Sequence, residues 1–235
     1  MSQRITAFVF LLTMMSAAQA HDLWIEREVQ GYVLQSGHRA SDHHHGDRKL
    51  RHDYPRDFVT QAICLDVAGN SHNLPTDTVP FQAPTTCVGL FIQASSGFWT
   101  KTPFETVNRP RTEVRQAVDS WLSLENVKRI DQWLPVFSEP LGNGLELVPL
   151  EDPTTLGRGD KLHLRVMMDG RPVEGAVVSY DGDIRGASAA DGHINIRLRE
   201  AGLQQLTASL ETPHPGPEAD RTIHTSVLNF EVSGQ

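Results

Sequence analysis

The sequence predicts a mainly β protein with a β-sandwich architecture and one helical insertion. Three observations support this fold class. Apolar and polar residues alternate over short segments through most of the chain, Asp-Gly turn signals separate such segments near the C-terminus, and apolar residues at three- and four-residue spacing occur in one region only. With 235 residues, of which 39% are apolar, the chain is long enough to bury a core.

Residues 1–20 have the organisation of a secretory signal peptide. Arg4 precedes an apolar run from Ile5 to Met15, and small residues then lead to Ala20. The run is too short to span a bilayer and is followed at once by polar sequence. We therefore expect cleavage after Ala20, which would leave a periplasmic protein that begins at His21 and is not embedded in the membrane.

Residues 21–145 are predicted to form an N-terminal β-rich domain. The segment from Leu23 to Gln35 contains two short β-like runs that break near Gly31, which predicts a strand and its hairpin partner. The polar residues 36–56 are typical of a loop. Further strands are predicted at residues 58–67 and 88–94.

The two cysteines of the chain, Cys64 and Cys87, lie in or beside these two strands. An even number of cysteines in an exported protein predicts a disulfide bond. Two buried free thiols are the alternative.

A helical segment is predicted at residues 112–134, as one amphipathic helix or two short ones. Pro110 is compatible with a first helical turn, and Pro135 would stop the helix. The apolar residues that fall at helical spacing are Val114, Val118, Trp121, Leu122, Val127, Ile130, Trp133 and Leu134.

Residues 146–235 are predicted to form a C-terminal β-sandwich domain. Leu162, Leu164 and Val166 alternate with polar or longer side chains, and turn signals occur at Asp169-Gly170 and Asp191-Gly192. Further strands are expected at residues 173–180, 194–198, 203–210 and 222–232. Five short strands with regular turns are typical of a small antiparallel sandwich.

Charge and composition narrow the function. A net charge of -8 argues against a nucleic-acid partner, which would need clustered lysine and arginine. Eleven histidines against two cysteines favour a transition metal, because imidazole nitrogen suits nickel, cobalt, copper and zinc. The chain contains no Gly-x-Ser-x-Gly elbow, phosphate loop or His-Glu-x-x-His pair. We therefore expect a binding protein and not an enzyme.

His21 is a candidate bidentate metal ligand. After cleavage it would carry both an α-amine and an imidazole, and the amine nitrogen and Nδ1 can close a six-membered chelate ring. The α-amine is easier to deprotonate than a lysine, since its ordinary pKa is about 8. The predicted hairpin would return the chain toward the N-terminus and bring His38 near His21. The alternative is a mobile terminus without function.

Two other groups of residues allow both a functional and a structural interpretation. His43, His44 and His45 would form a metal-capture segment or a solvated loop. Asn108-Arg109-Pro110-Arg111, preceded by Lys101, would bind an anion or face solvent.

Several segments resemble a known family, the periplasmic component associated with bacterial nickel and cobalt uptake transporters. The N-terminal segments that carry the resemblance are His21–Glu26, Gly37–Arg39, Lys101–Pro103 and Asn108–Pro110. In the C-terminal half they are Pro140–Gly142, Gly159–Leu162, Gly170–Val173, Gly175–Ala176 and Asp191–Gly192, and this half is similar to transthyretin-like and carboxypeptidase regulatory-like sandwich modules.

The resemblance implies a nonenzymatic protein that binds Ni²⁺ or Co²⁺ near its processed N-terminus and supports delivery to a membrane transporter. The matching ligand positions are His21 and His38, with His224 as a further position. Spacing does not separate nickel and cobalt from Cu²⁺ or Zn²⁺, because coordination geometry decides metal choice. Two other classes stay open: a copper-binding histidine-brace oxidase, and a structural or adhesion module that binds no metal.

Overall fold

The computed structural model describes residues 22–29, 31–37, 51–78 and 80–233. It is 56% strand and 7% helical, which confirms the mainly β fold class. The strands are β1 (Asp22–Glu28), β2 (Gly31–Gly37), β3 (Arg51–Asp53), β4 (Val59–Asp66), β5 (Ser71–Asn73), β6 (Cys87–Lys101), β7 (Thr106–Val107), β8 (Asp119–Ile130), β9 (Leu145–Pro149), β10 (Lys161–Met168), β11 (Arg171–Pro172), β12 (Val177–Tyr180), β13 (Asp183–Ala187), β14 (His193–Arg197), β15 (Gly202–Pro213) and β16 (Arg221–Val232). The described helices are short 3-10 turns: η1 (Arg56–Phe58), η2 (Arg111–Glu113), η3 (Pro135–Ser138) and η4 (Pro153–Thr155).

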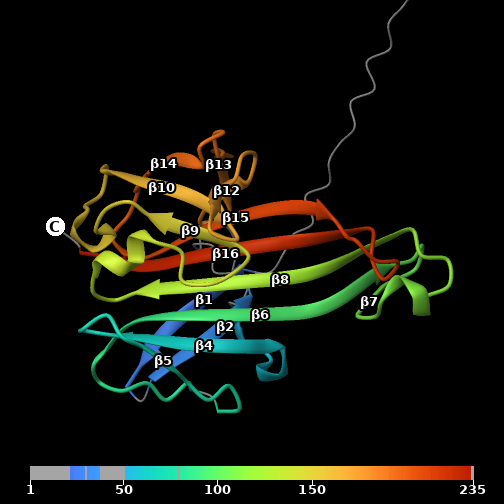
Figure 1. Cartoon of the computed structure of the whole chain (residues 1–235), viewed down its shortest axis with the longest axis horizontal. Coiled ribbons are helices and arrows are strands. Elements are labelled where there is room, and N and C mark those ends of the chain that lie inside the picture. The colour runs from blue at the N-terminus through green and yellow to red at the C-terminus, as the bar shows by residue number, and fades with distance from the viewer. Residues whose placement is uncertain (1–21, 30, 38–50, 79, 234–235) are drawn as a thin grey trace, which may run out of the picture.

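The strands form three sheets (Figure 1). The central sheet has the order β13-β12-β15-β16-β8-β6-β4-β5, with β7 also paired to β6. A small sheet holds β1-β2-β3, and another holds β11-β10-β14 with β9 on the remaining side of β10. β16 pairs with β8 in parallel, from Arg221 opposite Trp121 to Phe230 opposite Ile130. Strands from both sides of residue 145 therefore share the central sheet.

Two apolar cores lie on opposite faces of the central strands β8 and β16. Val127 and Val227 pack into one core together with residues of β1, β2, β4 and β6. Ile130, Leu228 and Phe230 pack into the other core, with residues of β9, β10, β12 and β15. Because side chains alternate along a strand, neighbouring residues of β8 and β16 serve different cores.

Each small sheet is fixed to the central strands by hydrogen bonds from side chains to the backbone of one of its strands. For β1, the backbone N–H of Ile25 donates to Asn229 Oδ1 over 2.9 Å, and Arg129 Nη1 donates to the Ile25 carbonyl over 2.9 Å. For β9, the Leu147 N–H donates to Ser226 Oγ over 2.8 Å. Backbone groups that have no strand partner there are thus satisfied by polar side chains of β8 and β16.

The predicted helix at residues 112–134 is wrong. Residues 119–130 form β8, and the described helical structure in that range is the single turn η2. The physical reason is that both faces of β8 are buried over residues 125–130, where Val127 lies in one core and Ile130 in the other. A strand that buries both faces lacks simple polar and apolar alternation, and its apolar residues then fall by chance at helical spacing.

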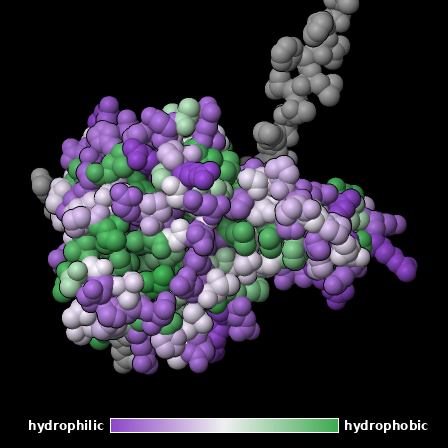
Figure 2. Space-filling model, viewed as in Figure 1, coloured by the Kyte–Doolittle hydropathy of each residue, from purple (hydrophilic) through white to green (hydrophobic). Residues whose placement is uncertain are grey.

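The other predicted strands are confirmed by β4, β6, β10, β12, β14, β15 and β16. The far ends of β6, β8, β15 and β16 extend together beyond both small sheets, and β7 lies near their end (Figure 1). We call this extension the arm, comprising residues 97–123 and 209–223. Figure 2 shows it as a projection from the body of the protein. Across the described residues, no helix is long and apolar enough to cross a membrane.

Candidate functional site

The first candidate site is the end of the small sheet at which β1 begins and β2 ends. Asp22 lies opposite Gly37, and Leu23 lies opposite Ser36. β3 extends the sheet on the other side of β2, where the exposed His52 lies opposite Ser36. The predicted hairpin is therefore confirmed, and three chain segments meet at this end of the sheet.

The predicted ligands of this site adjoin the hairpin in the chain. His21 precedes Asp22, and His38 follows Gly37. Both lie outside the described residues, as do His43–His45 and the predicted signal peptide. The hairpin register nevertheless fixes which described positions flank His21 and His38.

The turn of this hairpin is held against the rest of the protein at the other end of the sheet. Gly31 has a φ of 148°, and a Cβ at this position would lie 2.0 Å from the Phe81 carbonyl oxygen. Only glycine allows this approach, in which Tyr32 and Phe81 exchange two backbone hydrogen bonds of 3.1 and 2.7 Å. The hairpin is therefore tied to the segment before β6.

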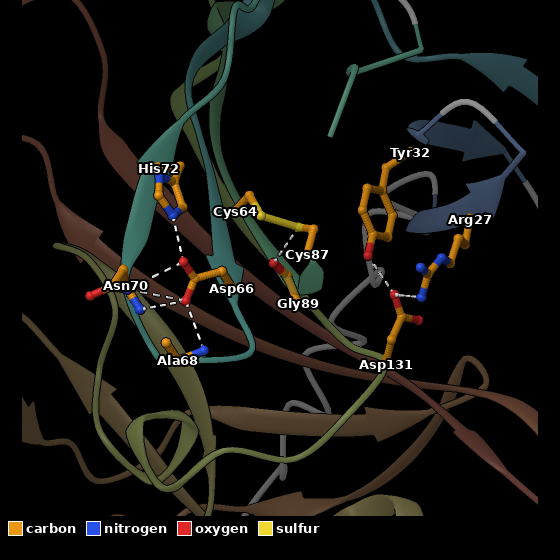
Figure 3. The surroundings of a disulfide bond; sticks show 10 residues. All are labelled: Arg27, Tyr32, Cys64, Asp66, Ala68, Asn70, His72, Cys87, Gly89 and Asp131. Atoms are coloured by element: carbon orange, nitrogen blue, oxygen red, sulfur yellow. Dashed lines mark hydrogen bonds and ion pairs between the residues drawn. A yellow bond between two sulfur atoms is a disulfide. The ribbon is translucent and has the colours of Figure 1, made fainter. Parts of the chain in front are cut away.

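Charged groups add a second tie. Asp131 Oδ2 accepts from the Tyr32 hydroxyl over 2.5 Å and from Arg27 Nη1 over 3.2 Å (Figure 3). Burial raises the pKa of Tyr32, and the Asp131 carboxylate raises it further. Asp131 also accepts from Arg129 Nε over 2.7 Å. One carboxylate thus connects β1, β2 and β8.

A buried carboxyl lies at the other side of the small sheet. Glu125 of β8 accepts from Ser123 Oγ over 2.8 Å, from Ser96 Oγ over 3.2 Å and from the Ser96 N–H over 3.3 Å. The hydroxyl of Tyr54, which follows β3, lies 3.5 Å away. Burial raises the pKa of Glu125, although these hydrogen bonds oppose the shift. The cluster connects the end of β3 to the base of the arm.

The predicted disulfide is confirmed. Cys64 of β4 and Cys87 at the start of β6 are bonded, and their Cα atoms are 5.8 Å apart (Figure 3). Both residues are buried. The bond closes the segment between two neighbouring strands and is consistent with a protein outside the reducing cytoplasm.

Beside the disulfide, Asp66 ends β4 and organises the turn to β5 (Figure 3). Its carboxylate accepts from His72 Nε2 over 2.7 Å and from the N–H groups of Ala68 and Asn70 over 2.9 Å each. These hydrogen bonds, led by the one from His72, lower the pKa of Asp66 to about 2. The arrangement is that of a turn stabilised by its own aspartate.

His224 lies away from the hairpin end. Asn229 points to β1, whereas Ser226 and therefore His224, which is an even number of residues further along β16, point to the opposite face. His224 Nε2 lies 3.0 Å from Thr212 Oγ1, and burial lowers its pKa. It borders a cleft of about 390 Å³ that is also lined by Gln93, Asn126 and Asp169.

The remaining described histidines pair with acids or hydroxyls. His163 Nδ1 lies 2.8 Å from Glu151 Oε1, and His193 Nδ1 lies 2.9 Å from Asp191 Oδ2. His214 Nδ1 lies 3.0 Å from Thr222 Oγ1. Within the described ranges, no three histidine, cysteine, aspartate or glutamate side chains are grouped so that they would hold a metal ion.

The basic segment at residues 108–111 is partly structural. The Asn108 side-chain amide donates to the carbonyls of Ser96 and Phe98, over 2.8 Å each. Arg111 Nη1 pairs with Asp220 Oδ2 over 2.7 Å. Arg109 is exposed near the end of the arm.

Sequence reasoning missed the polar residues that hold the small sheets, namely Glu125, Lys128, Arg129 and Asn229. One signal in the sequence could have indicated them, namely charged residues on the apolar face of the helix predicted at residues 112–134. Lys128 and Arg129 lie between Val127 and Ile130, where an amphipathic helix would have to bury part of its charged face. A strand with both faces buried explains why Lys128 and Arg129 lie between two apolar residues, because Lys128 then points to one face and Arg129 to the other.

A family model for a domain of unknown function, DUF4198, matches residues 18–212. The chain belongs to the DUF4198 family. The DUF4198 match covers β1 to most of β15 and ends before β16, the strand that joins both halves of the central sheet. A search of curated proteins found no match.

Proposed function

We propose that this protein is an exported, nonenzymatic carrier of nickel or cobalt that supports metal uptake by a membrane transporter. The proposed ligands are the α-amine and imidazole of His21 and the imidazole of His38. The observation that supports this proposal most directly is the register of the β1–β2 hairpin, in which Asp22 lies opposite Gly37. The two proposed ligands directly adjoin these paired residues in the chain.

The anchoring of β1 supports a defined site. Arg129 and Asn229 bind both backbone groups of Ile25, three residues from Asp22. A ligand set next to an anchored strand loses less conformational entropy on metal binding than one on a free terminus. Neutral imidazole and a deprotonated amine are suitable donors for Ni²⁺ and Co²⁺, and also for Cu²⁺ and Zn²⁺.

The proposal treats His43–His45 and His224 differently from His21 and His38. His43, His44 and His45 would form an auxiliary capture segment, because neighbouring imidazoles can bind one ion together. His224 is not included as a ligand of this site, since its side chain is on the opposite face of the central sheet from the β1 contacts. The disulfide supports export, and the predicted signal peptide makes the periplasm the proposed location.

The test is calorimetric titration of Ni²⁺, Co²⁺, Cu²⁺ and Zn²⁺ into the chain that begins at His21. The comparison protein carries one additional alanine before His21, which moves the α-amine while leaving every side chain intact. We expect binding to weaken by at least about tenfold in the extended protein. His38→Ala should weaken it similarly, whereas His163→Ala, in the distant β10, is a matched control and should leave it unchanged.

Each result of this titration has a distinct meaning. Equal binding by both proteins would assign the metal to internal histidines and reject the terminal chelate. Absence of binding in both proteins would favour the structural or adhesion module. Reduction of bound Cu²⁺ with oxygen consumption would favour the histidine-brace oxidase. Because protons compete for the ligands, we also expect affinity to fall below about pH 6.5, the ordinary histidine pKa.

A further inference from the structure

The end of the arm displays an apolar side chain that no internal packing requires. Phe104 lies in the turn between β6 and β7 and is 87% exposed. Burying a phenylalanine side chain is favourable by about 2 kcal/mol, so an exposed one contributes little to folding. The exposed position therefore calls for another explanation.

The turn that carries Phe104 is fixed by its own hydrogen bonds. Thr102 Oγ1 accepts from the N–H groups of Phe104 over 3.2 Å and of Glu105 over 3.1 Å. The Thr102 N–H donates to the Glu105 carbonyl over 2.8 Å. Phe104 is thus presented by an ordered turn, which lowers the entropy cost of burying it against a partner.

Phe104 is one of the residues that line a cup of about 440 Å³ at the end of the arm. Val107 and Val114 contribute apolar surface to it, and Arg109, Arg115, Glu105 and Glu113 contribute charge. In the part of the chain that the structure describes, none of these four charged side chains takes part in an ion pair. The end of the arm therefore combines an exposed aromatic ring with a hollow that two valines and charged side chains of both signs line, and none of these charges is paired among the described residues.

We propose that two copies of this protein associate through the ends of their arms. Across a twofold axis, Phe104 of each copy enters the cup of the other, and the arginines of one copy face the glutamates of the other. A surface with both a protrusion and a hollow, and with two charges of each sign, is complementary to itself. The arm also keeps the two bodies apart, which limits repulsion between chains that each carry a net charge of -8.

The first experiment measures self-association of the chain from residue 21 onward by sedimentation equilibrium over a range of concentrations. We expect a monomer–dimer equilibrium, and we expect Phe104→Ser to weaken it at least tenfold. Ile184→Ser is the matched control, because Ile184 is also exposed, at 68%, but lies on β13. It should leave the equilibrium unchanged. Thermal unfolding of each variant verifies that it is folded.

The second experiment exchanges the charges. One variant carries Arg109→Glu and Arg115→Glu, and the other carries Glu105→Arg and Glu113→Arg. Each should be monomeric by itself because like charges would meet across the axis. An equimolar mixture should form a heterodimer, which only direct contact between the two arm ends explains.

Three outcomes would overturn the proposal: a chain that is monomeric at all concentrations, a dimer that tolerates Phe104→Ser, or reversed-charge variants that fail to associate when mixed. Binding of the monomer to phospholipid vesicles that is lost in Phe104→Ser would instead assign the arm end to a membrane surface. None of these outcomes depends on whether the hairpin end binds metal.

Discussion

The two small sheets are attached to opposite faces of the same two strands, β8 and β16, but the charges at the two attachments differ in burial. Lys128 and Glu146, at the attachment of β9, form an ion pair of 2.5 Å in which each side chain is only 1% exposed. Arg129, at the attachment of β1, pairs with Asp131, where the two side chains are 6% and 8% exposed, and with Glu231, whose side chain is 53% exposed. The C-terminal attachment excludes water, whereas the N-terminal one borders solvent.

This difference shows how one fold can combine a rigid C-terminal sandwich with a β1–β3 sheet that opens more easily. A buried ion pair costs desolvation and leaves a strongly unfavourable charge when one partner is removed. A pair in which one partner is exposed, such as Arg129 and Glu231, keeps water as a substitute for that partner. We therefore expect the β1–β3 sheet to open locally more often than the C-terminal sandwich, which suits the proposed exchange of a metal ion at its end.

The largest effect is expected for Lys128→Met. The substitution leaves the Glu146 carboxylate buried, with only the N–H groups of Leu141 and Gly142 as partners. We expect a loss of about 3–5 kcal/mol in the free energy of unfolding. Denaturant titration measures it, and adding Glu146→Gln to the same chain should restore part of the loss. A loss below 1 kcal/mol would contradict a large free-energy cost of leaving the buried Glu146 carboxylate without its ion-pair partner.

A smaller effect is expected for Arg129→Met. This variant loses the hydrogen bond to the Ile25 carbonyl and the pairing with Asp131. We expect a loss of about 2 kcal/mol, because Asp131 keeps Tyr32 and Arg27 as partners after the substitution. Hydrogen exchange should show reduced protection in β1 and β2, with β10 and β14 unchanged. Uniform loss of protection would mean that the two attachments are not independent.

A matched pair of substitutions on β16 compares the two faces directly. Ser226→Ala removes the acceptor of the Leu147 N–H, and Asn229→Ala removes the acceptor of the Ile25 N–H. Each leaves one buried N–H unpaired, so we expect losses of about 1–2 kcal/mol. Ser226→Ala should affect protection in β9, and Asn229→Ala in β1. The opposite pattern would exclude the proposed role of each residue.

The smallest effect is a pH dependence from Glu125. Its pKa in the folded protein is raised above the ordinary value of 4.5, so the fold favours the protonated carboxyl. This contribution is present below pH 4.5 and is lost as the pH rises through the folded pKa. Glu125→Gln stays neutral, and its melting temperature relative to the unchanged protein should therefore rise from pH 4 to pH 8. A constant difference would show that folding does not raise the pKa of Glu125.

Local features of the sequence were sufficient for much of this protein. The break at Gly31 predicted the hairpin, since a tight turn between two apolar runs brings neighbouring segments together. The disulfide between Cys64 and Cys87 could be predicted because each cysteine lies in or beside a predicted strand, and two neighbouring strands can bring the cysteines together. The alternation at Leu162, Leu164 and Val166 predicted β10, a strand with one face in the core and the other toward solvent.

The tertiary structure alone decided the centre of the molecule. β8 is a strand because two layers cover it and because β16, about one hundred residues further along the chain, pairs with it in parallel. The local spacing of residues 119–130 predicts neither the two covering layers nor the pairing with β16. The positions of His224 and Glu125 on opposite faces followed from that pairing and from the alternation of side chains along it. Sequence patterns report local periodicity, whereas the choice of which surfaces are covered depends on contacts between distant segments.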